Sequence, residues 1–363
     1  MTEVGLKKSD LDTPALWVDL DLLEQNIASL SRFFQEAGVN WRPHTKGIKI
    51  PAIAHKAIQA GAIGVTCAKL SEAEVMAAAG ITNILIANEV VGAKKLTRLA
   101  HLQRHAEVKP CVDSEANLVE MGQIAAACGV EIGVLVDVDT GMHRAGATPG
   151  EATVKLASLA HRTPGLRFMG LMAWEGHTVA IEDPQTKRQK IEAAIGLLAQ
   201  TADLCRAADL PVEIISGGGS GSYTMSAFVP GLTEIQAGGA MFCDATYLKW
   251  GAGTTPSLFV QTMVVSRPAP DRIIFDAGFK ALPAWDGRMP QPVNLPGFQS
   301  YRTSAEHGAV LLDSPDEAIQ VGDLFDFIVG YGDSTVFLHD NLYGVRNGVV
   351  EVVWPIQGRG KIQ

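Results

Sequence analysis

The sequence predicts an α/β protein with a (β/α)8 barrel of the TIM type, followed by a mostly antiparallel β domain. Two observations support this architecture. Between residues 15 and 245, short apolar runs of strand length alternate with longer amphipathic segments, as is typical of parallel strands joined by helices. After about residue 246 the helical periodicity fades, and apolar runs separated by Gly, Pro and Asp turns take over.

Eight apolar runs in the first part are predicted to be barrel strands. They are residues 39–44, 64–69, 83–88, 108–113, 132–139, 166–174, 212–216 and 233–238. Amphipathic segments between them, such as residues 51–61, 71–80 and 187–210, are predicted to be helices. Eight such units in about 200 residues match the length of a closed barrel. A doubly wound open sheet is the alternative, because periodicity alone does not show whether a sheet closes.

The second part is predicted to be a separate β domain. Its expected strands are residues 258–268, 272–278, 325–330, 334–340 and 348–356. We therefore expect a barrel domain over residues 15–245 and a β domain over residues 246–363, with residues 1–14 pairing with the β domain.

The composition excludes several classes of function. The chain has 363 residues and a formal charge of -9, which argues against a nucleic acid as the main partner. It has no apolar run of about 18 residues that could span a membrane. The first residues, MTEVGLKKSD, lack the apolar core of a secretory signal. The five cysteines form no CxxC pair, so we expect reduced thiols, a cytoplasmic location and no zinc–cysteine site.

The end of the first predicted barrel strand carries an unusual group of basic residues, in the stretch RPHTKGIK (42–49). In a barrel, catalytic side chains gather on the loops at the carboxyl ends of the strands. A partly desolvated lysine near other cations has a lowered pKa and can attack a carbonyl carbon. Lys46 is the candidate, with Arg42, His44 and Lys49 supplying nearby positive charge. The alternative is that these lysines only solvate a loop.

A glycine-rich loop, SGGGSGS (216–222), follows the seventh predicted strand, and the eighth ends at Gly238 and Gly239. Backbone N–H groups of such loops bind anions, and the loops after strands seven and eight are the recurrent phosphate site of these barrels. The loop fits neither a dinucleotide fingerprint nor a Walker motif. A carbonyl-reactive lysine beside a phosphate site is what pyridoxal 5'-phosphate (PLP) requires. A tight turn rich in glycine for packing is the alternative.

Longer motifs resemble one enzyme family. The segment 42–49 resembles the cofactor-lysine segment of the D-threonine aldolase and D-serine dehydratase family, and DVDTGMHRAG (137–146) is similar to a segment which that family shares with alanine racemases. The resemblance continues, in the same order, through residues 170–177, 216–223, 233–239, 276–280, 304–308 and 352–360. It covers nearly the whole chain and implies a PLP enzyme that acts on a small D-amino acid as a homodimer.

The resemblance also implies roles for individual residues. Lys46 is expected to bind PLP covalently, Arg144 to hydrogen-bond its phenolic oxygen, and Trp174 to stack on its ring, where the family has His or Tyr. The phosphate is expected at Gly219, Ser220, Gly221, Gly238 and Gly239, with Tyr223 and Gln236 close by. The substrate is expected at His44, Glu306 and His307.

The metal site of the family is altered in this chain. Aldolases and dehydratases of the family bind a divalent metal through a His-x-Asp or His-x-Cys pair. In the matching stretch, GYGDSTV (330–336), Asp333 fits but Tyr331 stands at the histidine position. A neutral phenol is a poor ligand compared with imidazole. Either no metal binds, or a hard ion is held by Asp333, water and a further residue such as His339, which would favour Mg or Mn over Zn.

The expected reaction is retro-aldol cleavage of a D-β-hydroxy amino acid to glycine and an aldehyde. The alternatives, in order, are dehydration of D-serine or a 3-hydroxy-D-amino acid, racemisation, and PLP binding without turnover. A barrel that uses the lysine without a cofactor is a further alternative. Cleavage needs a base near the hydroxyl group, for which His177, His307 or a metal-bound water could serve. Racemisation needs a second base, for which Tyr331 is the candidate.

Overall fold

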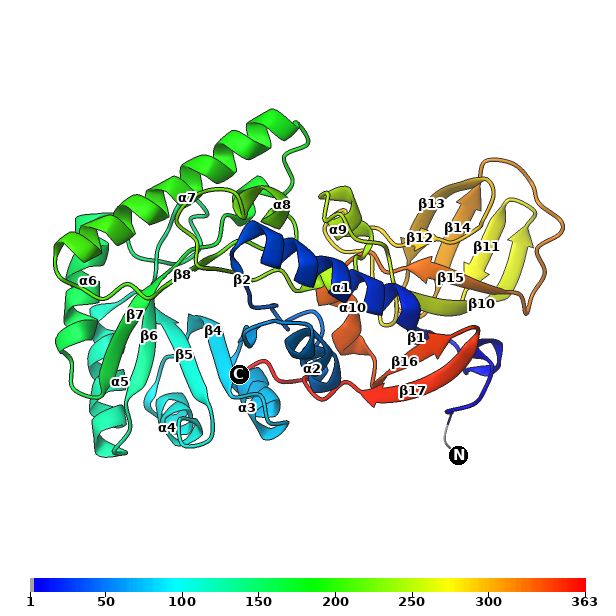
Figure 1. The fold of residues 1–363 in the computed structure, drawn as a ribbon. Helices are drawn as coiled ribbons and strands as arrows, with labels where there is room; N and C mark the ends of the chain where they lie inside the picture. Colours follow the sequence, from blue (N-terminus) through cyan, green and yellow to red (C-terminus); the bar gives the residue numbers. More distant parts are fainter. Residues whose placement is uncertain (1–2) are drawn as a thin grey trace. The chain divides into compact units, whose positions relative to one another are not determined.

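The computed structural model describes residues 3–363 and contains two compact units (Figure 1). The barrel unit comprises residues 30–46, 53–238 and 361–363. The sheet unit comprises residues 3–29, 47–52 and 239–360. The domain boundaries expected from the sequence, 15–245 and 246–363, differ from this division, because residues 15–29 and 47–52 lie in the sheet unit. The expected boundaries stay a proposal.

The barrel unit contains one sheet of eight parallel strands. They are β2 (Asn40–Trp41), β3 (Val65–Cys67), β4 (Asn83–Glu89), β5 (Glu107–Val112), β6 (Ile132–Asp137), β7 (Leu166–Met172), β8 (Ile214–Gly217) and β9 (Glu234–Ile235). Their order across the sheet is β2-β9-β8-β7-β6-β5-β4-β3. Each predicted apolar run overlaps one of these strands, so the prediction of eight barrel strands is confirmed.

The two edge strands, β2 and β3, are joined where the chain continues beyond β2. His44 forms a parallel bridge with Thr66. The backbone N–H of Thr45 donates to the Thr66 carbonyl (2.7 Å), and the N–H of Thr66 donates to the Pro43 carbonyl (2.9 Å). These bonds turn the sheet into a TIM-like barrel. The doubly wound alternative, whose strand order reverses at a switch point, is therefore wrong.

Helices follow the barrel strands, and α3 to α7 lie on the outer side of the curved sheet (Figure 1). The helices that follow barrel strands are α2 (Pro51–Gln59), α3 (Leu70–Ala78), α4 (Ala93–Leu102), α5 (Glu115–Ala127), α6 (Glu151–Arg162), α7 (Pro184–Ala207) and α8 (Tyr223–Ser226), and α1 (Leu20–Ala37) precedes β2. Fully buried side chains such as Ile84, Val134 and Phe168 pack between strands and helices in one apolar core. The segments predicted to be helices overlap α2, α3 and α7, as expected.

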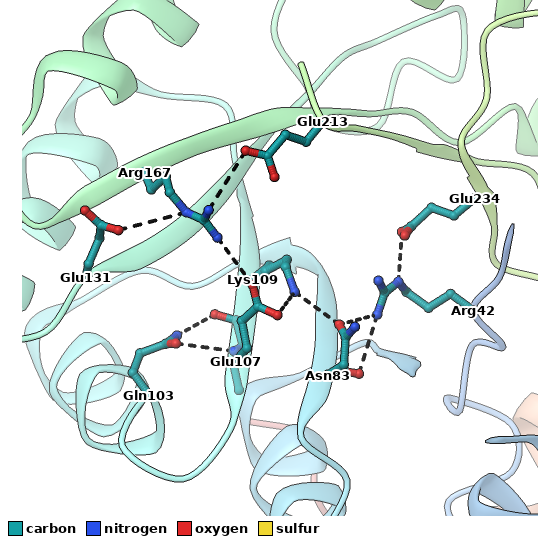
Figure 2. A network of polar contacts seen from close by, with 10 residues as sticks. Arg42, Asn83, Gln103, Glu107, Lys109, Glu131, Arg167, Glu213 and Glu234 are labelled. Carbon is teal, nitrogen blue, oxygen red and sulfur yellow. Dashed lines mark hydrogen bonds and ion pairs between the residues drawn. The ribbon is translucent and has the colours of Figure 1, made fainter. Parts of the chain in front are cut away.

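The barrel interior is polar at the amino-terminal ends of its strands (Figure 2). Arg42 is only 2% exposed, and its guanidinium binds Glu234 (2.9 Å) and the side chain of Asn83 (2.8 Å). Lys109 binds Glu107 (2.8 Å) and Asn83 (3.1 Å), and burial lowers its pKa. These direct pairings offset part of the desolvation cost of the buried charges.

The expected position of Arg42 beside Lys46 is wrong. The chain from residue 40 to residue 45 is extended and alternates its side chains, so Arg42 and His44 point to the same side, whereas Lys46 lies in the turn that follows. The extended chain from Arg42 to Thr45 spans about 10 Å. Arg42 therefore pairs with Glu234, the first residue of β9, at the opposite end of the barrel. Lys49 lies in the sheet unit, where it is buried and packs against Gly358.

The sheet unit contains a nine-stranded sheet, antiparallel at every pairing except β1 with β16. Its strands are β1 (Ala15–Asp19), β10 (Leu258–Ala269), β11 (Arg272–Phe275), β12 (Gln291–Pro292), β13 (Phe298–Thr303), β14 (Gly308–Leu312), β15 (Leu324–Ile328), β16 (Asn341–Arg346) and β17 (Val349–Pro355). The main strand order is β13-β14-β11-β10-β1-β16-β17, and β15 pairs with β10 and β12. Residues 5–8 pair with β17 and the turn before it, through bonds such as Gly5 N–H to the Val350 carbonyl (2.9 Å).

The strand predicted at residues 334–340 is wrong. The chain there forms a short helix, α10 (Gly332–Thr335), and a 3-10 turn (Val336–Leu338). The apolar alternation of TVFLH is typical of a strand, but the hydroxyl groups of Ser334 and Thr335 both donate to the Tyr331 carbonyl (3.0 Å each). Such local side-chain bonds favour a helical turn over a sheet.

Two further findings concern the cysteines and the helices of the described residues. All five cysteines are free thiols, and all except Cys128 are buried. Within residues 3–363, no helix has both the length and the apolar composition needed to cross a membrane.

Candidate active site

The barrel residues expected to hold PLP follow five consecutive strands at their carboxyl ends. Lys46 follows β2, Gly238 follows β9, the glycine loop (residues 218–222) follows β8, Trp174 follows β7 and Arg144 follows β6. Because these strands are parallel and adjacent in the order β2-β9-β8-β7-β6, their carboxyl ends lie together at one end of the barrel. Lys46 and the glycine loop therefore lie at the same end of the barrel unit.

Lys46 lies in a turn directly after the bridge that closes the barrel. Its backbone N–H donates to Nδ1 of His44 (3.3 Å), and both side chains are half-buried. This bond orients the His44 ring within the turn that carries the lysine. The pair is therefore fixed to the barrel seam, where the backbone is held by His44 and Thr66.

The glycine loop is held by a buried carboxylate that the sequence analysis missed. Glu175 is 2% exposed, and it accepts hydrogen bonds from the Ser222 hydroxyl (2.7 Å) and the Gly218 N–H (3.2 Å). Ser222 in turn accepts from the Gly219 N–H (3.1 Å). Burial raises the pKa of Glu175, and these hydrogen bonds oppose the rise. The one sequence signal was the position of Glu175 next to Trp174, at the end of a predicted strand.

Replacing Glu175 by alanine is expected to weaken PLP binding roughly ten- to hundredfold, because a lost buried acceptor costs about 1–3 kcal/mol. Glu175→Gln keeps one acceptor oxygen for Ser222 and is expected to bind PLP more tightly than Glu175→Ala. Absorbance titration of PLP into the cofactor-free variants measures this. Equal affinity of wild type and Glu175→Ala would show that the carboxylate does not support the loop.

Trp174 packs against the glycine loop. A Cβ atom placed on Gly219 would lie 2.5 Å from Cζ3 of the Trp174 ring, and one on Gly176 would lie 2.3 Å from its Nε1. Contacts this short cannot be tolerated, so both positions need glycine for the ring to occupy this place. The large flat ring is half-buried beside the glycine loop, as a residue that stacks on a cofactor ring requires.

Other predicted phosphate residues make structural contacts. A Cβ on Gly238 would lie 2.0 Å from the His44 carbonyl oxygen, so this glycine permits the close approach of β9 to the end of β2. Gly239 lies in the sheet unit, where the Tyr247 ring packs on it. Gln236 donates to the Ser216 hydroxyl (2.9 Å) inside the barrel. Tyr223 is buried, and its ring packs edge-on against Phe33.

Arg144 is exposed on the loop after β6, near the carboxyl groups of the buried Asp137 and the half-buried Glu89. Burial and the neighbouring Glu89 raise the pKa of Asp137 to about 7, and the positive charge of Arg144 opposes this rise. One oxygen of Glu89, Oε1, is buried without a hydrogen-bond partner. Sequence reasoning missed the pair, although Asp137 begins the motif that contains Arg144.

His177 lies on the same end of the barrel as these residues. Its ring packs on Gly141, because a Cβ there would lie 3.3 Å from the His177 Cε1 and Nε2 atoms. Desolvation lowers the pKa of His177 below its usual value. The imidazole is therefore neutral at pH 7 and can accept a proton.

In the sheet unit, Tyr331 and Asp333 contact each other directly. The Tyr331 hydroxyl donates to Oδ2 of Asp333 (2.8 Å). Burial and the Asp333 charge raise the pKa of Tyr331, so the phenol stays neutral. Asp244 accepts from the Gly332 N–H (2.6 Å), and burial raises its pKa to about 8. A Cβ on Gly47, the residue after Lys46, would lie 2.2 Å from Oδ1 of Asp333.

Glu306 and His307 lie on the exposed turn between β13 and β14 of the sheet unit. Glu306 forms an ion pair with Lys280 (2.5 Å), and the His307 N–H donates to the Ser304 hydroxyl (3.2 Å). The pairing joins two of the motifs found in the sequence, residues 276–280 and 304–308. These two side chains belong to a different unit from the barrel residues above.

Comparison with known proteins identifies the family. Residues 18–246 match the family described as "Alanine racemase, N-terminal domain", and residues 257–345 match "Putative serine dehydratase domain". The chain is 37% identical to a D-threonine aldolase from Arthrobacter sp. over 96% of its length and 93% of that protein. It belongs to the D-threonine aldolase and D-serine dehydratase family.

Further members of the D-threonine aldolase and D-serine dehydratase family are also similar. A 3-hydroxy-D-aspartate aldolase from Paracoccus denitrificans is 34% identical over 98% of this chain and 94% of that protein. The crystal structure of D-threonine aldolase from Filomicrobium marinum superposes with a TM-score of 0.96 at 36% identity and covers all of both chains. A D-threo-3-hydroxyaspartate dehydratase from Delftia sp. is 30% identical over 82% of this chain and 83% of that protein.

These relatives establish the class of enzyme. The chain is a PLP-dependent lyase with the fold of the alanine racemases. Retro-aldol cleavage of D-β-hydroxy amino acids, the first expectation from the sequence, is supported over dehydration, because the aldolases match this chain at higher identity and coverage than the dehydratase.

The barrel residues fit PLP, the cofactor of this family. Trp174 occupies its place only because residues 176 and 219 lack a Cβ, which leaves a flat aromatic face beside the glycine loop. An amine (Lys46), a guanidinium (Arg144) and the backbone of the glycine loop lie at one end of the barrel. They match, in turn, the aldehyde, the phenolate and the phosphate of PLP.

Proposed function

We propose that this chain holds PLP at Lys46 and cleaves small D-β-hydroxy amino acids, D-threonine among them, to glycine and an aldehyde. The observation that carries the proposal is the common location of Lys46, Trp174 and the glycine loop at the carboxyl ends of adjacent barrel strands. When bound, PLP supplies an electron sink for the negative charge that develops at the substrate Cα atom.

The residue roles follow from the side chains and their places. Lys46 provides the amine that binds the cofactor, and the loop that Glu175 holds offers backbone N–H groups and the Ser220 hydroxyl to the phosphate. Arg144 stabilises the ionised phenolic oxygen, and Trp174 offers its face to the ring. We propose that His44, Glu306 and His307 orient the substrate.

His177 is proposed as the base that accepts the proton of the substrate β-hydroxyl group. His177→Gln is expected to lower kcat about 10²- to 10³-fold, which is typical for the loss of a general base. His161→Gln, at an exposed position of α6, is the matched control and is expected to keep wild-type activity.

The pH dependence tests the same role. A base must be unprotonated, and desolvation lowers the pKa of His177. Wild-type kcat/KM is therefore expected to fall only below the ordinary histidine pKa of about 6.5, and His177→Gln should lose this acidic limb. An unchanged pH profile in the variant would remove His177 from the mechanism.

Tyr331 argues against the racemase alternative. A racemase needs a second base on the opposite face of the substrate, and Tyr331 was the candidate. Its raised pKa and its bond to Asp333 keep the phenol neutral, with its proton directed to the carboxylate. A neutral phenol is a poor base at pH 7.

The product distribution tests the proposed function directly. The purified enzyme is incubated with D-threonine and, separately, with D-serine, and aldehyde, keto acid and L-isomer are assayed in parallel. We expect acetaldehyde and glycine from D-threonine as the main products. Keto acid as the main product would favour the dehydratase, the L-isomer would favour the racemase, and no product would favour a PLP-binding protein without turnover.

We further propose that the enzyme is a cytoplasmic homodimer. The free thiols of the described residues are consistent with a reducing compartment. The homodimer follows from the resemblance to enzymes that build their sites at a dimer interface. Sedimentation equilibrium of the purified protein is expected to give twice the mass of one chain.

A further inference from the structure

We infer that residues 331–333 form a metal-free, hydrogen-bonded pair, and that cleavage by this chain proceeds without a divalent ion. The inference rests on the proposed function, because it concerns the group that handles the substrate hydroxyl. In the family motif this position carries a His-x-Asp or His-x-Cys metal-binding pair, whereas this chain has Tyr331 and Asp333.

The first observation is the direct bond between the two side chains. The Tyr331 hydroxyl donates to Oδ2 of Asp333 at 2.8 Å, and a second hydrogen bond joins the Tyr331 and Tyr247 hydroxyls. The carboxylate thus accepts a hydrogen bond from the residue that would have to be its fellow ligand. A neutral phenol has no imidazole-like lone pair to offer a metal ion.

The second observation is the packing that fixes the phenol ring. The Tyr331 ring stacks on Trp285 (6.1 Å between ring centroids, 15° between planes) and contacts the rings of Tyr247 and Trp250. The Arg288 guanidinium carbon lies 5.0 Å from the centre of the Tyr331 ring. A fixed positive charge against this ring disfavours a dication at its edge.

The third observation is the lack of further ligands. Within residues 3–363, His, Cys, Asp and Glu side chains form no group of three or more that could hold a metal ion. Asp244 directs its two oxygens to the Gly332 and Tyr247 N–H groups (2.6 and 2.9 Å). His339, the further ligand considered from the sequence, has its Nε2 atom 2.8 Å from the Ala281 carbonyl oxygen. Neither a tetrahedral zinc site nor an oxygen-rich magnesium or manganese site is assembled.

The experiment measures metal content and metal binding in the PLP-loaded enzyme, independently of activity. The wild type, Tyr331→His and Tyr331→Phe are purified, treated with a chelator, dialysed and titrated with MnCl2 by calorimetry. Tyr331→His restores a His-x-Asp pair and is expected to bind about one Mn²⁺ per chain, since imidazole and carboxylate both suit this ion. The wild type and the control Tyr331→Phe are expected to show no stoichiometric binding.

Activity before and after chelation gives the second readout. We expect the wild-type rate to stay unchanged after chelation and after added Mn²⁺. Stoichiometric metal in the wild type, or a chelator-sensitive rate that Mn²⁺ restores, would overturn the inference. Tyr331→His without a gain in Mn²⁺ binding would also count against it, because the tyrosine would then not be what prevents binding. If the wild type binds no metal but D-threonine is not cleaved, the proposed function fails and the metal-free pair stands.

Discussion

Lys46→Ala is expected to lower kcat roughly a thousandfold or more, because the group that binds the cofactor covalently is lost. The variant should also lose the yellow colour of the bound cofactor. Its fold should be kept, since Lys46 lies in a half-buried turn and its amine is not part of the apolar core. Turnover of D-threonine and the visible absorbance spectrum measure the two effects.

Lys94→Ala is the matched control for this experiment. Lys94 is an exposed lysine on α4, and its loss is expected to change neither colour nor turnover. A Lys46→Ala variant that kept both properties would assign the cofactor to another residue.

Gly238→Ala is expected to lower the stability of the barrel by about 1–3 kcal/mol or more. The added Cβ would lie 2.0 Å from the His44 carbonyl oxygen and 2.6 Å from its nitrogen. Both are backbone atoms at the seam, where the His44 N–H also donates to the Gln236 carbonyl (3.2 Å). Neither strand can move away without breaking the seam next to Lys46. Steric conflicts of this kind in a packed core cost about 1–3 kcal/mol or more.

The control for Gly238→Ala is Gly196→Ala. Gly196 lies in α7, and a Cβ there would meet no atom within 4 Å. This substitution is expected to raise stability by about 0.5–1 kcal/mol, the usual gain for Gly→Ala inside a helix. Thermal unfolding of the PLP-loaded proteins compares the two variants. A Gly238→Ala protein that unfolds at the wild-type temperature would show that the seam is not as tightly packed as described.

The sequence was sufficient to predict the barrel and the end of it that carries the chemistry. Strand-length apolar runs alternating with amphipathic segments allow parallel β/α units and few other arrangements, and all eight strands were found. The places of Lys46 and the glycine loop follow from the same pattern, because parallel strands bring their carboxyl ends together. The hydrogen bond from the Lys46 N–H to His44 did not follow from the pattern.

The direction in which a side chain points and the residue that it contacts were harder to predict than the strand end at which it lies. Arg42 and Lys46 are close in sequence, but the extended chain between them covers about 10 Å before the turn that carries Lys46. Arg42 therefore joins the ion pairs at the other end of the barrel. Glu175 and Asp137 were missed because their roles come from residues distant in sequence, Ser222 and Glu89. A carboxylate at a strand end does not reveal its partner.

The strand order of the sheet unit could not be predicted from the sequence either. β1 lies between β10 and β16, which are separated from it by more than 230 residues. Such non-local pairing leaves no local signal in the chain. In residues 332–338 a local signal was misleading. The apolar alternation predicted a strand, but the hydrogen bonds of Ser334 and Thr335 to the Tyr331 carbonyl favour a helical turn.

Borohydride reduction of the purified, PLP-loaded enzyme, followed by proteolysis and mass spectrometry, tests the central claim most directly. Reduction makes the bond between the cofactor and its amine permanent. The account predicts that the reduced cofactor is found on the peptide that contains Lys46 and on no other lysine. A label on a different lysine, or an enzyme that stays active and unlabelled after reduction, would contradict it.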